Sequence, residues 1–333
     1  MTEDQPEPLA EPDESEAQPG PDPIETAPTV PAPEPPELDP EDPKTKLVER
    51  LKSVLAGLPS FFEFNNNFSG VNATDLHALN TLLGASIEGQ VVKALNLQRP
   101  IWDPDDEWLG YIFERQSQVF PDVRLVRRDE DGEIEVGLGI ELKGWFLLAK
   151  EGVPSFRFTT TPAACADHDL LVVLPWYLDN VLGGAPVAAQ PFVVSARWAA
   201  QYRNYYWQHM RVTSDSTEIH SPPGAAPYPT SDTRISDSPA YDRGGNFGRV
   251  ARVSGLMDDF IAAANNTEVL GIRMGDWHTF LRLHSDNADL DQVTAKLRTD
   301  LTRKVTKRSK ADAELLAAAV VTISEILKAS EGS

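Results

Sequence analysis

The chain alternates between stretches with helical and stretches with strand-like spacing of apolar residues. Residues 45–58 carry leucines at helical intervals, and residues 74–96 carry a longer apolar stripe, so a helix is predicted over each range. The stripe of the second helix consists of Leu76, Leu79, Leu83, Ile87, Val91 and Leu95. Later helical patterns cover roughly 197–210, 248–264, 276–284, 288–308 and 311–328.

Strand-like segments lie between these helical regions. Residues 120–127 and 133–148 predict two strands, and the Asp-Gly step between them is a hairpin signal. Residues 156–160, 169–174 and 191–196 are further candidates, and the unbroken apolar run in 169–174 is typical of a strand buried on both faces. The order of helix, sheet and helices predicts an α/β fold with a mostly helical C-terminal part.

The first 43 residues differ in composition from the rest. They hold 14 Asp and Glu, no Lys or Arg, and 13 of the 27 prolines. Because such a segment buries too little apolar surface to offset its ordering entropy, a disordered tail is predicted over 1–43 and a domain over 44–333. The core of the domain covers about 74–211. The Ser-, Pro-, Gly- and Asp-rich residues 213–246 predict a flexible loop before a helical part at 247–328.

Charge and cysteine content narrow the class of protein. The formal net charge is −21, but without the tail the chain has 51 − 14 = 37 acidic and 30 basic residues, a charge of −7. Any nucleic-acid contact must therefore come from a local basic face. No apolar run approaches the roughly 20 residues that span a bilayer. Cys165 has no second cysteine to pair with. These features favour a soluble, cytoplasmic protein with no membrane partner.

Chemistry-bearing residues occur in the first two predicted strands. Pro121-Asp122 opens the first strand, and Glu141-Leu142-Lys143 lies inside the second. Glu141 and Lys143 are two residues apart and share a face, and a hairpin brings Asp122 beside Glu141. Leu142 points into apolar packing, and its carbonyl can serve as a metal ligand. A buried strand rarely carries both a Glu and a Lys unless they are used or paired, and the alternative is a Glu141–Lys143 salt bridge on a half-exposed strand.

Pro121-Asp122, 18 further residues and Glu141-Leu142-Lys143 together resemble the PD-(D/E)XK nuclease motif, which type II restriction endonucleases and many repair nucleases share. The resemblance implies a mixed central sheet flanked by helices, Asp122 and Glu141 as ligands of Mg²⁺ (with Mn²⁺ as a substitute), and Lys143 as the residue that assists the attacking water. Many members of the family add an acidic residue from the preceding helix. Glu88 is the candidate for that role, and Glu114 is its competitor.

Several basic residues are candidate nucleic-acid contacts. Arg157 is predicted on the strand after the catalytic pair, where a surface ion pair is the alternative. Arg197 and Arg203 lie among aromatic residues of one helix, a mixture that suits base stacking, although helical spacing also favours the aromatics as core. Lys304 and Lys307 belong to a basic stripe that can grip a DNA backbone or form a solvated helix face.

These features together predict a Mg²⁺-dependent DNA endonuclease of the restriction type. Double-stranded DNA is then the partner, a homodimer is expected because both strands are cut, and a partner methyltransferase is expected for a restriction system. One alternative is a repair or phage-defence nuclease of the same superfamily. The other is a non-catalytic module that binds DNA or a protein partner on the same fold.

Overall fold

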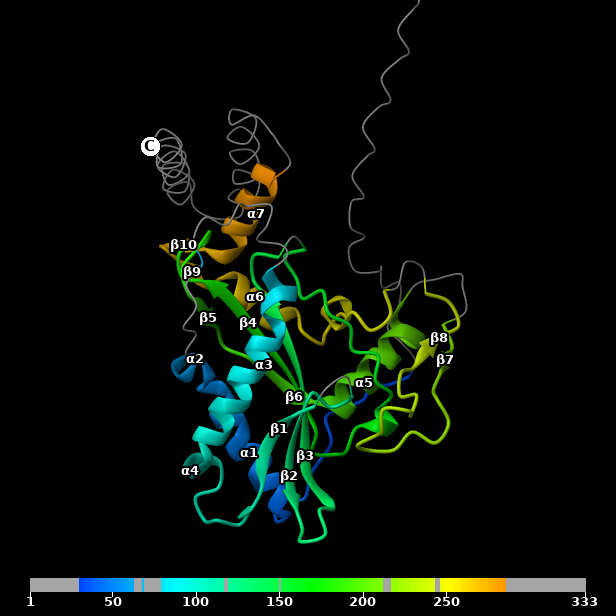
Figure 1. The fold of residues 1–333 in the computed structure, drawn as a ribbon. Helices are drawn as coiled ribbons and strands as arrows, with labels where there is room; N and C mark the ends of the chain where they lie inside the picture. Colours follow the sequence, from blue (N-terminus) through cyan, green and yellow to red (C-terminus); the bar gives the residue numbers. More distant parts are fainter. Residues whose placement is uncertain are drawn as a thin grey trace, which may run out of the picture.

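A six-stranded mixed sheet forms the centre of the molecule (Figure 1). The computed structural model describes residues 30–62, 68, 79–116, 119–149, 151–211, 217–242 and 246–285. The strands are β1 (Ile112–Arg115), β2 (Val123–Arg128), β3 (Ile134–Phe146), β4 (Leu170–Leu178), β5 (Pro186–Ala188) and β6 (Phe192–Ser195). Their order is β1-β2-β3-β4-β5, and β6 also pairs with β4. The predicted α/β class is therefore confirmed.

Helices surround the sheet, and two short strand pairs lie outside it. The helices are α1 (Pro43–Ala56), α2 (Leu58–Phe61), α3 (Leu79–Leu97), α4 (Arg99–Trp102), α5 (Ala196–Tyr205), α6 (Asp258–Asn265) and α7 (Met274–Ser285). A π-helical turn, η3 (Tyr206–Met210), continues α5, and the 3-10 turns are η2 (Pro162–Ala164) and η4 (Val250–Arg252). The short strands β7 (Ile219–His220), β8 (Ser238–Pro239), β9 (Glu268–Val269) and β10 (Ile272–Arg273) form two pairs. Among the described helices, none has the length and apolar character needed to cross a membrane.

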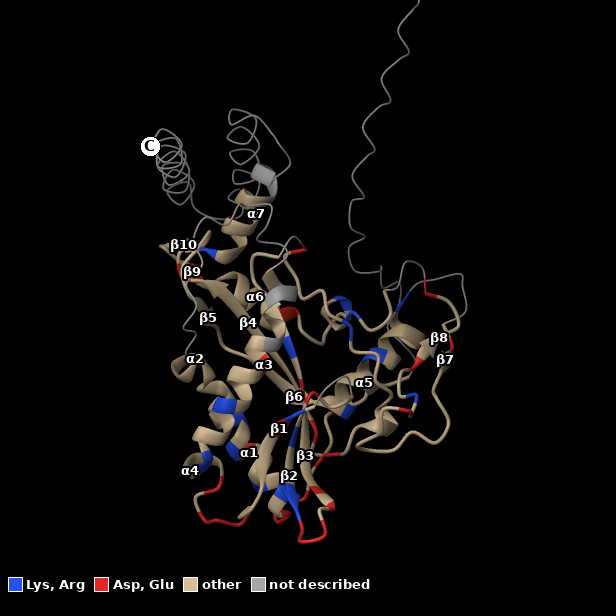
Figure 2. Cartoon of the chain, viewed as in Figure 1, with Lys and Arg blue, Asp and Glu red and all other residues tan. Residues whose placement is uncertain are grey.

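The β2–β3 hairpin sets the register of the sheet. The strands are antiparallel, with Val123 opposite Ile140 and Arg128 opposite Ile134, so the predicted hairpin is confirmed. β3 then pairs with β4 in parallel, with Glu141 opposite Leu171. Acidic residues gather in the turn between β2 and β3 and in the loop after α4 (Figure 2). The turn therefore lies at the far end of the hairpin from the residues near Val123 and Ile140.

β4 is the central, fully enclosed strand. On one side it pairs with β3, and on the other it pairs first with β6 and then with β5. Pro175 lies between those two partners, because β6 pairs only as far as Val173 and β5 begins its pairing at Trp176. The missing N–H of a proline is tolerated at such a seam, which explains a proline within a central strand.

α3 covers one face of the β1–β3 part of the sheet. The predicted stripe is buried at Leu79, Leu83, Ile87, Val91 and Leu95, while Leu76 lies outside the described residues. The end of the helix is tied to the edge strand, because the Asn96 amide donates to the Phe113 carbonyl at 2.9 Å and accepts from the Phe113 N–H at 2.9 Å. The strand β1 at this edge was not predicted from its apolar pattern.

Residues 30–42 differ from the prediction of a disordered tail. The Tyr205 hydroxyl donates to the Val30 carbonyl at 3.0 Å, and the Trp198 indole N–H donates to the Pro33 carbonyl at 2.9 Å. Asp42 then caps α1 by accepting from the Lys44 N–H at 2.8 Å. Because prolines have little backbone freedom to lose, few contacts suffice to hold this segment. Residues 1–29 lie outside the described residues.

Residues 217–242 differ from the prediction of a flexible loop over 213–246. The buried carboxylate of Asp237 accepts from the Arg203 guanidinium at 2.7 Å, from the Asn204 amide at 2.9 Å and from the Ser221 hydroxyl at 2.6 Å. A buried charge is stable only when it is paired and hydrogen-bonded in this way. The composition of the loop gave no sign of this anchor, because the partner lies on a different element.

Other predicted elements agree in part. Residues 154–159 form no strand, and Thr160 makes only an isolated bridge to Ser236. The predicted helix over 248–264 is divided into η4 and α6, while α7 corresponds to the pattern at 276–284. The predicted helices at 288–308 and 311–328 lie outside the described residues.

Candidate active site

Asp122, Glu141 and Lys143 meet at one end of the β2–β3 hairpin. Asp122 directly precedes β2, and the register of Val123 with Ile140 places it beside Glu141. The Lys143 ammonium lies 2.6 Å from Glu141 Oε1 and 3.2 Å from Asp122 Oδ2. The Leu142 N–H also donates to Asp122 Oδ2 at 2.9 Å. The three residues, called here the Asp-Glu-Lys cluster, therefore form one connected group on two strands.

The Glu141 carboxyl is buried and incompletely bonded. Burial raises the pKa of Glu141 to about 7; the Lys143 ammonium opposes this rise, and the neighbouring Asp122 carboxylate adds to it. Its Oε2 atom is buried and accepts no hydrogen bond. A buried oxygen without a partner is costly in a folded protein. Glu141 therefore has an oxygen available to a cation or a proton.

Lys143 is the cation of the Asp-Glu-Lys cluster and is largely buried. Burial by itself lowers the pKa of Lys143, but the carboxylates of Glu141 and Asp122 outweigh this effect and raise the pKa above its ordinary value. The side chain is consequently an ammonium at neutral pH. In this state it can donate hydrogen bonds and stabilise negative charge, but it holds its own proton firmly.

The position of Pro121-Asp122 depends on a close approach to β3. A Cβ atom built on Gly139 would clash with Pro121 Cγ and would lie 3.0 Å from Asp169 Oδ1. Asp169 Oδ1 accepts from the Gly139 N–H at 2.7 Å, which fixes the strand two residues before Glu141. Only a residue without a side chain allows these contacts, so Gly139 is part of the support of the site.

Asp169 and Tyr228 are supporting residues that the sequence did not reveal. Asp169 is fully buried just before β4, and its Oδ2 accepts from the Ala166 N–H at 2.8 Å. Tyr228, from the loop at 217–242, donates its hydroxyl to Asp169 Oδ1 at 3.0 Å. Burial raises the pKa of Asp169, and these hydrogen bonds oppose that rise. An acid immediately before an apolar strand was the available signal for Asp169; no local signal pointed to Tyr228.

Arg124 is a further basic residue close to the cluster. It follows Asp122 by two residues, and its register opposite Gly139 places it on the sheet face that carries Glu141 and Lys143. Its guanidinium donates to Gln116 Oε1 at 2.6 Å, while its Nε atom is buried without a hydrogen-bond partner. The alternation of Arg124 with apolar neighbours was the signal that could have identified it.

Glu88 is not brought to the cluster. Its carboxylate pairs with the Arg115 guanidinium at 2.7 Å. Arg115 is opposite Val123, which is opposite Ile140, so these residues share the sheet face that is opposite to the Glu141 face. Glu114, the competitor, is held by the Arg128 guanidinium. The structure therefore places both acids in ion pairs with arginines and not beside Asp122.

Arg203 is fully buried, so the prediction that it contacts DNA is wrong. It donates to the carbonyls of Phe158 at 2.6 Å and Thr160 at 3.1 Å, and it pairs with Asp237. Burial lowers the pKa of Arg203 to about 10, and the Asp237 carboxylate opposes this effect. The guanidinium faces inward because α5 turns this side of the helix toward the chain segments at 158–160 and 237.

The remaining predicted contacts have different positions. Arg197 donates to the Cys165 carbonyl at 2.9 Å from Nε and pairs with Asp167, so it holds the turn before β4. Arg157 is exposed, but it lies in the irregular segment 154–159 and not on a strand. Lys304 and Lys307 lie outside the described residues. The aromatic residues of the same helix are half-buried or buried, which agrees with the alternative that they pack.

The donor set of the cluster suits a hard divalent cation. Among the residues that the structure describes, no group of three or more His, Cys, Asp or Glu side chains is placed to hold a metal ion. Mg²⁺ is commonly bound by one or two carboxylates and keeps several waters. Asp122 and Glu141, with its unpartnered Oε2, supply the carboxylate oxygens that this mode of binding uses.

Comparison with protein-family models, with curated proteins and with solved structures finds no match to the chain.

Proposed function

We propose that the chain is a metal-dependent nuclease that hydrolyses phosphodiester bonds in DNA at the Asp-Glu-Lys cluster. The main support is geometric: the carboxylates of an aspartate and of a Glu-x-Lys pair, separated by 18 residues in the sequence, both lie within hydrogen-bonding distance of the Lys143 ammonium. The buried, unpartnered oxygen of Glu141 adds to this support, because a purely structural salt bridge would satisfy it.

The residues have distinct roles in this proposal. Asp122 and Glu141, with the Leu142 carbonyl, hold Mg²⁺ or Mn²⁺, and the ion supplies neutralisation of the phosphoryl oxygens and an activated water. Lys143 stabilises the charge that develops on the phosphate and orients the attacking water. Gly139 and Asp169 keep the strand and Pro121 in place, so that the carboxylates sit on a rigid base.

The test is cleavage of a mixed set of plasmid and phage DNAs with Mg²⁺. The wild type should cut, and Lys143→Ala should lose roughly 100-fold or more of the rate because transition-state stabilisation is removed. Lys52→Ala is the matched control, since Lys52 lies on α1 and pairs with Glu49. Equal cutting by the wild type and Lys143→Ala would place the activity elsewhere.

A non-catalytic DNA- or partner-binding module is the second candidate. The observation in its favour is that one ammonium already bridges both carboxylates, while the described residues offer no third acid. In that case wild type cuts neither plain nor modified DNA. Mg²⁺ or Mn²⁺ would also fail to raise the melting temperature, or Glu141→Gln would leave the increase unchanged.

The biological setting is a separate part of the proposal. A restriction enzyme gives discrete fragments, acts as a homodimer on double-stranded DNA and is accompanied by a methyltransferase. Smeared products would instead favour a repair or phage-defence nuclease. Analytical ultracentrifugation with and without DNA tests the dimer independently of the chemistry.

A further inference from the structure

Three aromatic side chains form a strip along α5. Trp198, Tyr202 and Tyr205 follow one another at spacings of four and three residues, which places them on one side of the helix. The ring centroids are 5.4 Å apart between Trp198 and Tyr202, and 5.9 Å apart between Tyr202 and Tyr205. This strip is called here the aromatic face of α5.

Residues 30–38, the proline segment, lie against this face. Their sequence is Val-Pro-Ala-Pro-Glu-Pro-Pro-Glu-Leu. The Tyr205 hydroxyl donates to the Val30 carbonyl at 3.0 Å, and the Trp198 indole N–H donates to the Pro33 carbonyl at 2.9 Å. Both acceptors belong to the main chain, so these two hydrogen bonds recognise the path of the backbone and not particular side chains.

The spacing of the donors matches the spacing of the acceptors. Trp198 and Tyr205 are seven residues apart on the helix, a rise of about 10.5 Å. Val30 and Pro33 are three residues apart, and one turn of a polyproline II helix rises about 9.3 Å over three residues. A proline-rich chain in that conformation therefore presents successive carbonyls in step with the two donors of α5.

The side chains of the proline segment repeat the same interval. Pro33 and Pro36 are half-buried, whereas Glu34 and Pro35 between them are exposed. This is the P-x-x-P spacing that fits an aromatic-lined groove, because every third residue of polyproline II faces the same way. The face thus has the chemistry of a site for proline-rich peptides.

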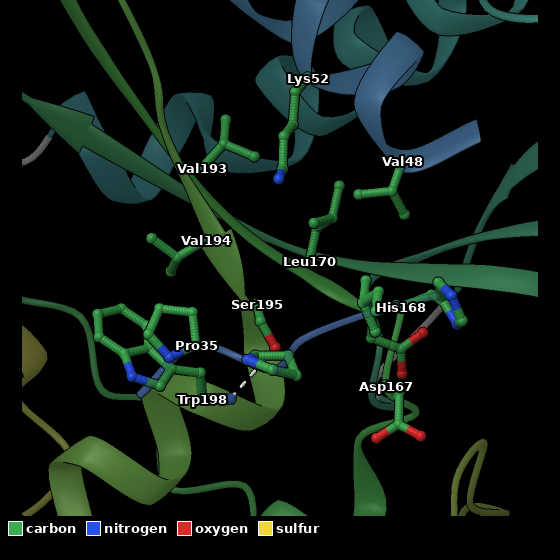
Figure 3. Close-up of a pocket in the computed structure, with 13 residues that line it drawn as sticks. Pro35, Val48, Lys52, Asp167, His168, Leu170, Val193, Val194, Ser195 and Trp198 are labelled. Atoms are coloured by element: carbon green, nitrogen blue, oxygen red, sulfur yellow. Dashed lines mark hydrogen bonds between the residues drawn. The ribbon is translucent and has the colours of Figure 1, made fainter. Parts of the chain in front are cut away.

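The chain's own segment leaves space at one end of this site. A cavity of about 290 Å³ is lined by Pro35, Pro36 and Leu38 of the segment and by Trp198 of α5. Figure 3 shows Pro35 beside the Trp198 ring at this cavity. Its apolar lining comes from α1, β4 and β6 and includes Val48, Leu170, Val193 and Val194. A segment with a larger apolar residue near the position of Leu38 would fill this space and bury more apolar surface.

We propose that the aromatic face of α5 is a recognition site for a proline-rich segment of a partner protein with P-x-x-P spacing. The proline segment occupies the site within the chain, and the partner's segment displaces it. The unfilled cavity and the small number of anchoring contacts favour exchange with a better-fitting segment. The inference does not depend on the proposed nuclease function.

The test uses the full chain in which Pro33→Gly and Pro36→Gly weaken the binding of its own proline segment to the aromatic face of α5. A fluorescent peptide of residues 27–40, with Leu38 replaced by Phe, is titrated and its anisotropy is measured. The double variant should bind it saturably, and the wild type should bind it at least about tenfold more weakly because its own segment competes at high effective concentration. Adding Trp198→Phe, which keeps a ring but removes the donor, should weaken binding by about three- to tenfold.

Two peptide controls and one assembly measurement complete the test. A peptide with Pro33 and Pro36 both changed to alanine should bind at least about tenfold more weakly. The peptide that keeps Leu38 should bind more weakly than the peptide with phenylalanine at that position. The proposal is overturned if the folded double variant, with unchanged circular dichroism, binds no peptide or binds all peptides equally. It is also overturned if the wild type dimerises and the double variant does not, because the occupant is then a second copy's segment.

Discussion

Two carboxylates share one ammonium in the Asp-Glu-Lys cluster, and this arrangement has an energetic cost. Glu141 is buried with one oxygen unpartnered, and burial keeps its pKa near 7 although Lys143 opposes the rise. A carboxyl whose pKa is higher in the folded state binds its proton more tightly when folded. Its contribution to stability is therefore greatest below the unfolded value of 4.5 and is lost as pH rises through about 7.

Glu141→Gln should remove the loss of stability that accompanies ionisation of Glu141. Relative to wild type, the free energy of unfolding of the variant should increase between pH 5 and pH 8, by roughly 3 kcal/mol at most. Urea unfolding in the presence of a chelator measures the difference at each pH. Glu135→Gln on the same strand is the control, because hydrogen bonds from Tyr111 and Arg127 lower the pKa of that exposed residue and no such increase is expected. A pH-independent difference for Glu141→Gln would contradict the stated burial effect.

The residues of the cluster could be predicted because they follow from local rules. The period of two along β3 places Glu141 and Lys143 on one face, and the hairpin brings Asp122 beside them. Glu88 and Arg203 could not be placed in this way. Their environments depend on which side of a helix packs against the sheet or against a distant loop, and spacing within the helix does not determine that choice.

At the scale of elements, the described helices and strands with a strong apolar pattern were predicted correctly. The apolar stripe of α3 and the unbroken run of β4 are buried as expected. β1 was missed because the edge strand is only four residues long, which is too short to show a clear period of two. The loop at 217–242 was misjudged because its order comes from Asp237, whose partner Arg203 lies on α5.

Asp237→Ala should destabilise the protein by about 3–5 kcal/mol. The reason is that the substitution leaves the buried Arg203 guanidinium without its charge partner. Hydrogen exchange should rise first in residues 217–242. Asp232→Ala, an exposed acid of the same loop, is the matched control and should change stability by less than about 0.5 kcal/mol. Equal effects of the two substitutions would show that the loop is not held through Asp237.

At the scale of the whole molecule, charge is unevenly distributed. Residues 1–29 hold nine acidic residues and no basic ones, out of 51 acidic residues in the chain. The acidic turn between β2 and β3 lies at the opposite end of the hairpin from the cluster (Figure 2). The long-range field of the chain therefore repels a polyanion, and only local groups such as Arg124 can favour its approach.

Replacing the nine acidic residues of 1–29 by Asn and Gln should strengthen DNA binding at low salt. The effect should be a few-fold and should shrink as salt is raised, because exposed charges are screened beyond about 10 Å at 0.1 M ionic strength. Fluorescence anisotropy with a DNA duplex across a salt series measures it. A gain that persists at high salt would indicate a direct contact of these residues and not a long-range field.

Arg203 has a consequence for recognising relatives of this chain. Its guanidinium serves two carbonyls, the Asn204 side chain and Asp237 together, and a lysine offers neither the number nor the planar arrangement of donors to replace it. A protein that keeps the loop must therefore keep both charges, and one that loses the loop is free to lose both. Joint retention of this arginine and aspartate, alongside Pro-Asp and Glu-x-Lys on adjoining strands, is a sequence signature that can outlast overall similarity.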